Sequence, residues 1–538
     1  MKMKPWLVYT IGALGGLLFG IDSGLTSGVI TPAEHYLNIT NASMDVLIAN
    51  VVTLGAGIMA IFAGKLNDKY GRKKMLISAS VVFLIGACCC SFASQAGGTT
   101  LVLSRLVLGL GIGIASAVVP SYLAELAPAA IRSQIATLFQ FAIVLGLETA
   151  YIIDFFVLPV VNGFAWMQHN FNVMLGCAAI PAIILFLGAI FMPESPRFLI
   201  KVGRVEEGKS VLLGMRNGDQ AAADAEYNAI QEILSDEGQS AEGGYKDCFT
   251  IAKKPLIAAF GIAFLQQLVG INAAFYYGPV IAGSVIPHPY ADAAAGSTEW
   301  IANLQQDQFY SIIFGIVNIV ATILTIFAMK KISSYKKTLY LGGAIMCLFS
   351  VLFVIQALTH FMPDVAAIVL ICLYIVGFAF SWGPLTWNIL GEIFPLAVRG
   401  VGSSISAAVN WFANFVVMSA FAIIIIKDAN GVAGHIENGF IVFAIGAILA
   451  IVFTIFCVPE TKDKSLEDIE KYFLAQKKSS GDNAVLGCII GALLIGIIVF
   501  ILPIFGVSIS PIVALITVIV ASLPYIFAIV NSIANKSN

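Results

Sequence analysis

Two charged side chains lie deep inside apolar segments of the sequence, where an unpaired charge is unfavourable. Asp22 falls within the segment 6–30, and Arg105 falls within 98–124. An isolated charge near the middle of a membrane helix costs about 2.5–3.5 kcal/mol on insertion scales. At the helical rise, both residues lie roughly 10–12 Å from the outer ends of their segments, so an ion pair is expected. The pair is either a fixed structural contact or a switch that opens when Asp22 takes up a proton.

Three carboxamides form a second chemical group in the segment 255–285. Gln266, Gln267 and Asn272 are spaced i, i+1 and i+6, so they would not share one face of a regular helix. Gly270, between them, predicts a local break that turns all three toward one cavity. Amides in a largely apolar cavity suit a polar ring such as a sugar, whereas the alternative is hydrogen bonding between helices.

Two motifs recur at nearly the same offset. The pattern Glu-x-x-Pro-x-x-x-Arg begins at Glu125 and again at Glu392, 267 positions later. Pro193-Glu194-Ser195 is matched by Pro459-Glu460-Thr461, 266 positions later. Two motifs at one offset indicate a duplicated half of about six apolar segments. Internal repeats in a membrane chain are typical of transporters.

The composition excludes a water-soluble globule. The 538 residues are 59% hydrophobic and 11% charged, against about 25% charged in ordinary soluble domains. Since a membrane span needs about 20 apolar residues, the sequence predicts an all-α polytopic protein. The expected spans are 6–30, 45–65, 74–94, 98–124, 132–160, 172–192, 255–285, 307–329, 338–359, 364–391, 400–426 and 436–458.

The spans divide the chain into two six-helix halves and two further parts. The halves are 1–192 and 255–473, joined by a polar linker, 193–254, with short helices near 205–216 and 221–235. The tail, 474–538, holds two more apolar stretches, interpreted as an extra transmembrane hairpin for packing or assembly. The Lys and Arg residues of the connections alternate from side to side. By the positive-inside rule, both termini of this multi-pass protein are cytoplasmic and it lies in the cell membrane.

Several short motifs in order resemble the sugar porter family of the major facilitator superfamily. They include Gly15-Gly16-Leu17-Leu18-Phe19-Gly20-Ile21-Asp22, Asp68-Lys69-Tyr70-Gly71-Arg72-Lys73, the two duplicated motifs, and Gln266-Gln267-Leu268-Val269-Gly270-Ile271-Asn272. The resemblance covers residues 6–473 and implies the major facilitator fold. Proton-coupled members carry an acid matching Asp22 and an arginine matching Arg105, so the resemblance implies symport.

The resemblance also implies further substrate-binding residues: Gln140, Trp387, Asn410 and Trp411, with Asn318 and Asn414 as weaker candidates. Ser381–Trp387 contains a Gly-Pro pair that predicts a bend in its helix. Glu148 departs from the family, where an uncharged amide is usual. It is interpreted as a sugar ligand, a second protonatable group or a carboxyl kept neutral by burial. Asp154 is expected to face water.

A last group of charges falls at the inner ends of the helices, where the family places residues that gate the cytoplasmic side: Asp68, Arg72, Glu125, Arg132, Glu194, Arg197, Glu392, Arg399 and Glu460. The counterpart of Asp68–Arg72 in the second half reads Lys331–Lys337 and lacks the Asp and the Gly. The gating contacts are therefore expected to be asymmetric.

Together these features predict a secondary transporter for proton:monosaccharide symport by alternating access. The alternatives are a facilitative uniporter, a polyol or inositol symporter, and a sensor that binds sugar without flux. The chain has no nucleotide-binding motif and no metal or catalytic spacing, so no enzyme activity, cofactor or metal is expected. The expected partners are a small sugar, a proton and the bilayer, with no nucleic acid, and a monomeric state.

Overall fold

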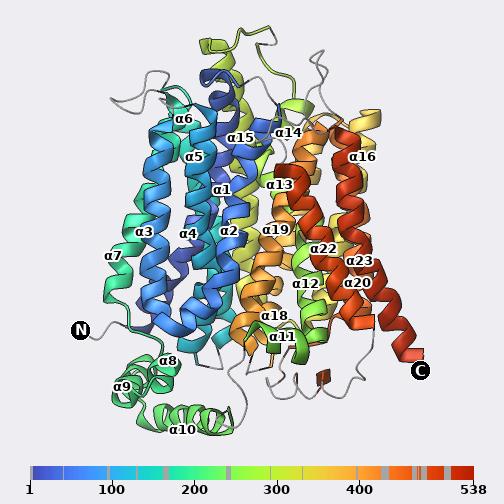
Figure 1. Ribbon diagram of the computed structural model, residues 1–538. Coiled ribbons are helices and arrows are strands. Elements are labelled where there is room, and N and C mark those ends of the chain that lie inside the picture. The colour runs from blue at the N-terminus through green and yellow to red at the C-terminus, as the bar shows by residue number, and fades with distance from the viewer. Residues whose placement is uncertain are drawn as a thin grey trace.

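The computed structural model describes residues 4–39, 42–93, 97–128, 131–160, 169–237, 244–290, 292–329, 331–395, 398–425, 435–462, 464, 469, 472–473, 481–501 and 510–537. In these ranges the regular elements are helices, and fourteen helical segments are long and apolar enough to cross a membrane. They form one bundle, with a group of short helices and both chain ends at the same end (Figure 1). We call this the linker end and the opposite end the far end.

The first half contains six spans. The helices are α1 (Pro5–Tyr36), α2 (Ala42–Tyr70), α3 (Arg72–Ser91), α4 (Gly98–Leu126), α5 (Arg132–Val157) and the consecutive pair α6 (Asn170–Cys177) and α7 (Ala179–Phe191). Helix α1 packs along α5, and α4 packs against α2 and α3. Glycines allow these close approaches: a Cβ on Gly20 would lie 1.9 Å from the carbonyl oxygen of Ile143.

The second half contains the other six spans, two of them interrupted. The helices are α12 (Lys253–Leu268), α13 (Ile271–Tyr276), α14 (Gly278–Val285), α15 (Thr298–Ala328), α16 (Tyr335–Thr359), α17 (Val365–Phe380), α18 (Trp382–Glu392), α19 (Arg399–Ile425) and α20 (Ile436–Cys457). Helix α2 packs against α19, and α5 packs against α15, so these two pairs join the halves.

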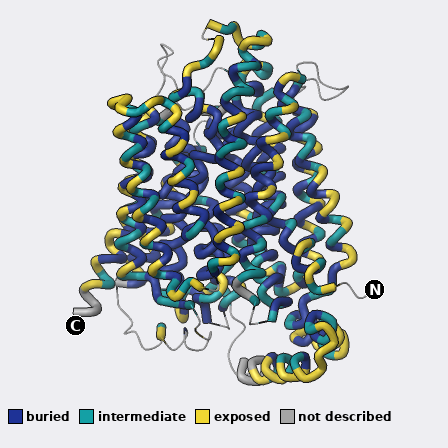
Figure 2. Tube along the Cα trace, turned by 180° about the vertical axis from the view of Figure 1, so that it is seen from behind, coloured by how far each residue is buried: buried dark blue, intermediate teal, exposed yellow. Residues whose placement is uncertain are grey.

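Short helices lie between the two halves, and two long helices follow the second half. The linker helices are α8 (Pro196–Lys201), α9 (Val205–Met215), α10 (Gln220–Glu237) and α11 (Tyr245–Ile251). The tail helices α22 (Gly481–Ile501) and α23 (Pro511–Ser537) pack on α12, α19 and α20. The Tyr525 ring lies between those of Phe264 and Phe453, at centroid distances of 4.6 and 6.0 Å. Exposed residues gather on the outside of the bundle and buried ones between helices, as expected of a body surrounded by lipid (Figure 2).

Three predicted boundaries were wrong by more than one turn, among them the end of the second span, which lies at Tyr70 rather than at 65. The first span continues past Ile30 and through Pro32 to Tyr36. The eighth span begins at Thr298 rather than at 307, because Ser297 caps it by accepting a hydrogen bond from the Trp300 amide. Its added turns mix polar residues such as the buried Asn303 with apolar ones such as the buried Ile301, so hydropathy alone placed the start too late.

Candidate functional site

A small cavity lies between the two halves, near the middle of the bundle. It encloses a free volume of about 40 Å³, which is room for a few water molecules, so it must widen to admit a monosaccharide. Seven of the predicted substrate residues line it: Gln140, Gln266, Gln267, Asn272, Asn318, Trp387 and Asn410. Further lining residues were not predicted, among them Ser23, Phe275 and Phe378. Ser23 directly follows Asp22, which is the one signal that would have found it.

The amides of the second half form a connected hydrogen-bond network on the cavity wall. Gln267 donates to the Asn410 side-chain oxygen over 3.1 Å and accepts from Asn272 over 2.7 Å. Asn410 in turn donates to Gln266 over 2.7 Å. Such mutual bonds hold each amide in one orientation and leave its remaining groups for a ligand.

The predicted helix breaks are what bring this network together. Gly270 has a φ of 86°, a left-handed conformation that favours glycine, and it separates α12 from α13. The change of direction puts Asn272 beside Gln267, which a continuous helix would not do. The second break falls at Ser381, with α17 before it and α18 after it. This break turns Trp387 into the cavity, where its ring meets that of Phe139 edge-on at 5.8 Å.

Three predicted substrate residues do not reach the cavity wall, among them Asn414, which donates to the Tyr276 hydroxyl over 3.2 Å. The Trp411 indole donates to Ser116 over 3.0 Å and packs edge-on against Phe19 at 4.6 Å, so it lies behind the aromatic lining. Glu148 faces α15 instead: a Cβ on Gly315 would lie 1.8 Å from the Glu148 Oε2 atom. Trp411 and Glu148 lie on the expected helices. Their positions in the sequence alone did not show whether each side chain would point into the cavity or toward an adjacent helix.

The predicted ion pair between Asp22 and Arg105 is present. Nη1 of Arg105 lies 3.5 Å from Oδ1 of Asp22, and both side chains are buried. The guanidinium also donates to the Ile48 carbonyl over 2.6 Å and to the Thr26 hydroxyl over 2.5 Å. Arg105 of α4 therefore ties α1 and α2 together at one point.

Asp154 does not face water. It is fully buried against α1, where a Cβ on Gly28 would lie 2.5 Å from the Asp154 carboxyl carbon. The expectation rested on its position near the end of the fifth span. Helix α1 packs along α5 and covers Asp154 at Gly28.

The far end is closed by contacts between the halves. The Tyr151 hydroxyl donates to the Phe275 carbonyl over 2.8 Å, and the Asn50 amide donates to the Tyr277 hydroxyl over 3.1 Å. The rings of His35 and Trp300 lie 5.3 Å apart. Beside them, burial and the neighbouring His35 lower the pKa of His169.

The linker end is closed as well. A Cβ on Gly64 would lie 2.6 Å from the Ser404 hydroxyl, so α2 and α19 touch closely there. The Tyr245 hydroxyl of α11 donates to the Ile61 carbonyl over 2.6 Å, and the Lys65 ammonium lies 4.3 Å from the centre of its ring. Burial raises the pKa of Tyr245, which keeps this hydroxyl a hydrogen-bond donor. Contacts between the halves therefore lie on both sides of the cavity.

Comparison with known proteins identifies the family. The model of the family described as "Sugar (and other) transporter" matches residues 8–473. The chain belongs to this family. It is 35% identical to a D-xylose transporter of Levilactobacillus brevis over 90% of this chain and 98% of the relative. It is 32% identical to the galactose-proton symporter of Escherichia coli strain K12 over 89% and 96% of the two chains.

Solved structures show the same fold. The proton:xylose symporter XylE bound to 6-bromo-6-deoxy-D-glucose is 26% identical and superposes with a TM-score of 0.72, over 87% of this chain and 98% of the other. This is the major facilitator fold, as predicted. The family match ends at residue 473, so α22 and α23 lie beyond it.

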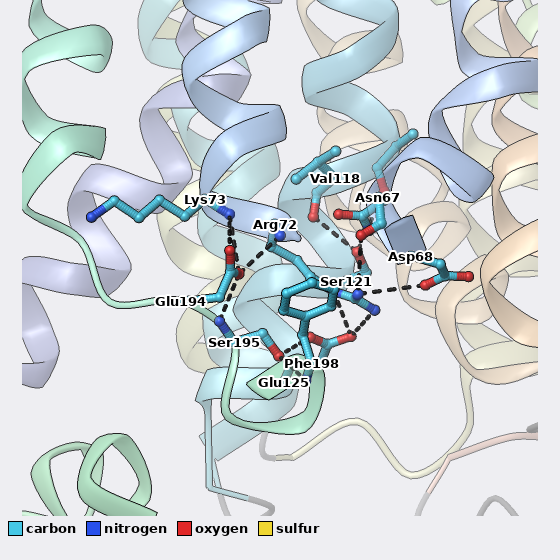
Figure 3. Close-up of polar contacts among 11 residues, drawn as sticks. Asn67, Asp68, Arg72, Lys73, Val118, Ser121, Glu125, Glu194, Ser195 and Phe198 are labelled. Carbon is cyan, nitrogen blue, oxygen red and sulfur yellow. Dashed lines mark hydrogen bonds and ion pairs between the residues drawn. The ribbon is translucent and has the colours of Figure 1, made fainter. Parts of the chain in front are cut away.

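This member of the sugar transporter family has a charged cluster at the linker end of its first half (Figure 3). Arg72 pairs with Glu125 at 2.8 Å and lies 3.4 Å from Asp68. The Glu194 carboxylate accepts from the Arg72 amide over 2.9 Å and from the Lys73 amide over 3.2 Å. Helix α3 thus starts on a carboxylate, which its dipole favours.

The corresponding cluster of the second half is less charged. Glu460 accepts from the Tyr335 amide over 3.1 Å and from the Lys336 amide over 3.4 Å, at the start of α16, and from the Ser334 hydroxyl. Arg399 donates to the Phe394 carbonyl over 3.2 and 3.3 Å. The predicted asymmetry of the two clusters is therefore present.

The remaining gating candidates are Glu392, Arg197 and Arg132. Glu392 lies at the end of α18 and is half-buried. Arg197 lies in α8, one turn from Glu194. The Arg132 side chain lies outside the described part of the structure, so its predicted contact with the first cluster stays a prediction.

Proposed function

We propose that the protein is a proton-coupled monosaccharide symporter of the cell membrane, with its linker end in the cytoplasm. The observation that carries the proposal is the adjacency of the two sites: Asp22 belongs to the buried ion pair, and the next residue, Ser23, lines the cavity. Relatives named as D-xylose transporter and galactose-proton symporter support both the substrate class and the coupling.

The coupling follows from the charge of Asp22. Ionised Asp22 attracts Arg105, which holds α1 and α2 against α4. A proton on Asp22 removes that attraction and frees α1 to move. Helix α1 carries Ser23, which is hydrogen-bonded to the Tyr276 hydroxyl, and Asn414 of α19 donates to the same hydroxyl over 3.2 Å. A change in the protonation of Asp22 would therefore affect, through Ser23, the contact between the halves.

The amides determine what is bound. A hexose or pentose presents several hydroxyl groups and an apolar ring face. Gln140, Gln266, Gln267, Asn272, Asn318 and Asn410 supply donors and acceptors, and Trp387 supplies an aromatic surface. Asp68 of the linker-end cluster lies against Gly400 of α19, where a Cβ would lie 3.2 Å from its Oδ2 atom, so this contact would be lost when the cytoplasmic side opens and would bias which side is closed.

The decisive experiment uses purified protein in liposomes with a proton gradient, acidic outside. The wild type should accumulate sugar, and Asp22→Asn should lose accumulation yet retain exchange of labelled for unlabelled sugar. Asp364→Asn removes an exposed carboxylate at the far end and is the matched control, expected to accumulate normally. Equilibration without response to the gradient would contradict symport and indicate a uniporter. Binding without flux would indicate a sensor. A panel of hexoses, pentoses and polyols in the same assay identifies the substrate.

A further inference from the structure

Among the described residues, three carboxyl groups are buried in the part of the first half that is nearer the far end. One of the three is paired with an arginine. Asp22 pairs with Arg105. Glu148 and Asp154 of α5 are also buried, with exposed fractions of 6% and 0%, and no Lys or Arg pairs with either in the described part of the chain. A buried carboxylate without a cation costs several kcal/mol, and the neutral acid costs much less.

Glu148 differs from Asp154 in what it faces. Asp154 lies against Gly28 of α1, inside the first half. Glu148 lies against Gly315 of α15, which belongs to the second half, and a Cβ there would come within 1.8 Å of Oε2. That oxygen is buried and has no hydrogen-bond partner among the described residues. Glu148 therefore fills a notch that exists only while the halves are packed together.

The position of Glu148 along α5 determines which opening exposes it. Gln140 lines the cavity, and Glu148 is about two turns, or about 12 Å, closer to the far end. One turn further, Tyr151 makes the contact with Phe275 that closes this end. Separation of the halves at the far end would bring water to Glu148, whereas opening at the linker end would leave it covered.

Among the residues that the structure describes, no charged group that faces Glu148 replaces the missing cation. On α5 the adjacent titratable group is Tyr151, whose neighbour across the interface is Tyr276 of α13. Helix α15 presents Gly315, and its acidic Asp307 two turns away is bound to His288 at 3.0 Å. From α1 the titratable group is Asp22, which is already paired with Arg105 of α4.

We propose that Glu148 is a second proton-binding site, which takes a proton from water at the far end each time that end closes. The O–H bond forms when the carboxylate leaves water and enters the notch at Gly315, and it breaks when the far end reopens and the proton returns to the same water. This proton does not cross the membrane with the sugar. It makes closure of the far end depend on the acidity of that side. The inference rests on the alternation of the two halves in the proposed function.

The transport test removes the titration of Asp22, so that the remaining pH dependence can be assigned to Glu148. In an Asp22→Asn background, sugar exchange should slow as the pH on both sides rises, approaching about tenfold per pH unit once Glu148 ionises in the open state. Adding Glu148→Gln should make the exchange rate independent of pH, and Glu148→Met should do the same if the glutamine variant does not fold. Adding Asp154→Asn, the matched control inside one half, should leave the slope unchanged. A flat profile in Asp22→Asn alone, or a slope that survives both Glu148 replacements, overturns the proposal.

An infrared measurement tests the site without transport. At about pH 7 the carbonyl absorption of protonated carboxyl groups should lose one component in Glu148→Gln and keep it in D22N, while the component from Asp154 remains in both. An unchanged band in Glu148→Gln overturns the proposal. If only the symport proposal fails, the wild type should not accumulate sugar, but the infrared band and the pH dependence of exchange should both remain.

Discussion

The two halves share their backbone arrangement at the linker end and differ in the side chains placed on it. Glu194 accepts hydrogen bonds from the first amides of α3, and Glu460 accepts them from the first amides of α16. In the first half Arg72 adds an ion pair beside this cap. In the second half Tyr335 stands in the place of Arg72, and the Ser334 hydroxyl before it donates to Glu460. Duplication preserved the helix cap, while the charge around it diverged.

The same division appears inside the membrane. The first half holds the ion pair of Asp22 and Arg105, and the second half holds the connected amides. Each half thus does one part of the proposed chemistry on a common backbone, and variants in one half should affect one part. The predictions below test that separation.

The largest effect is expected from Arg105→Gln. Removing one member of a buried ion pair costs about 3–5 kcal/mol, because the other charge is left alone. Without Arg105 the buried Asp22 carboxyl has no cation to favour its charged form, so proton-driven accumulation should be lost and thermal stability in detergent should fall. Sugar affinity, measured by calorimetry, should change much less because the amides are untouched. A loss of affinity as large as the loss of accumulation would contradict the division between the halves.

The converse variant is Gln267→Ala in the second half. It removes bonds to Asn410 and Asn272 together with any bond to the sugar, so affinity should weaken about tenfold to a hundredfold. The proton-to-sugar ratio, from accumulation at known gradients, should stay as in the wild type. Gln356→Ala is the matched control, since that amide bonds Met362 away from the cavity. A changed ratio in Gln267→Ala would show that the amides take part in coupling.

The sequence predicts this fold well because its strongest signals are local. Apolar length determines the spans, the repeat determines the halves, and Gly270 marks a break that needs a left-handed residue. Where the prediction failed, the deciding contact came from a distant segment. Glu148 and Trp411 lie on the expected helices, yet whether they meet the cavity depends on how α15 and α4 pack against them. Asp154 is covered by α1 at Gly28 in the same way.

A smaller effect is expected from Arg72→Gln at the linker end of the first half. Charged hydrogen bonds are worth about 1.5–3 kcal/mol, and Arg72 makes them to Glu125 over 2.8 and 3.2 Å. Losing them should destabilise the state closed at that end, shifting the protein toward the cytoplasm-open form. Labels placed on α4 and α18 at the linker end would report this as a longer average distance in pulsed electron resonance. Unchanged distances would mean that the cluster supports the first half internally and does not gate it.

The smallest effect is expected from Ser334→Ala in the second half. Ser334 caps α16 by accepting from the Lys337 amide over 3.0 Å, and its hydroxyl also donates to Glu460. Loss of such a cap costs about 1 kcal/mol, and no charge is left unpaired because Glu460 keeps its backbone amides. The same labels should therefore show a shift clearly smaller than in Arg72→Gln, with a modest fall in Tm. An equal or larger shift would mean that the neutral cap holds the linker end as firmly as the ion pair, and the asymmetry of the two halves would have no part in gating.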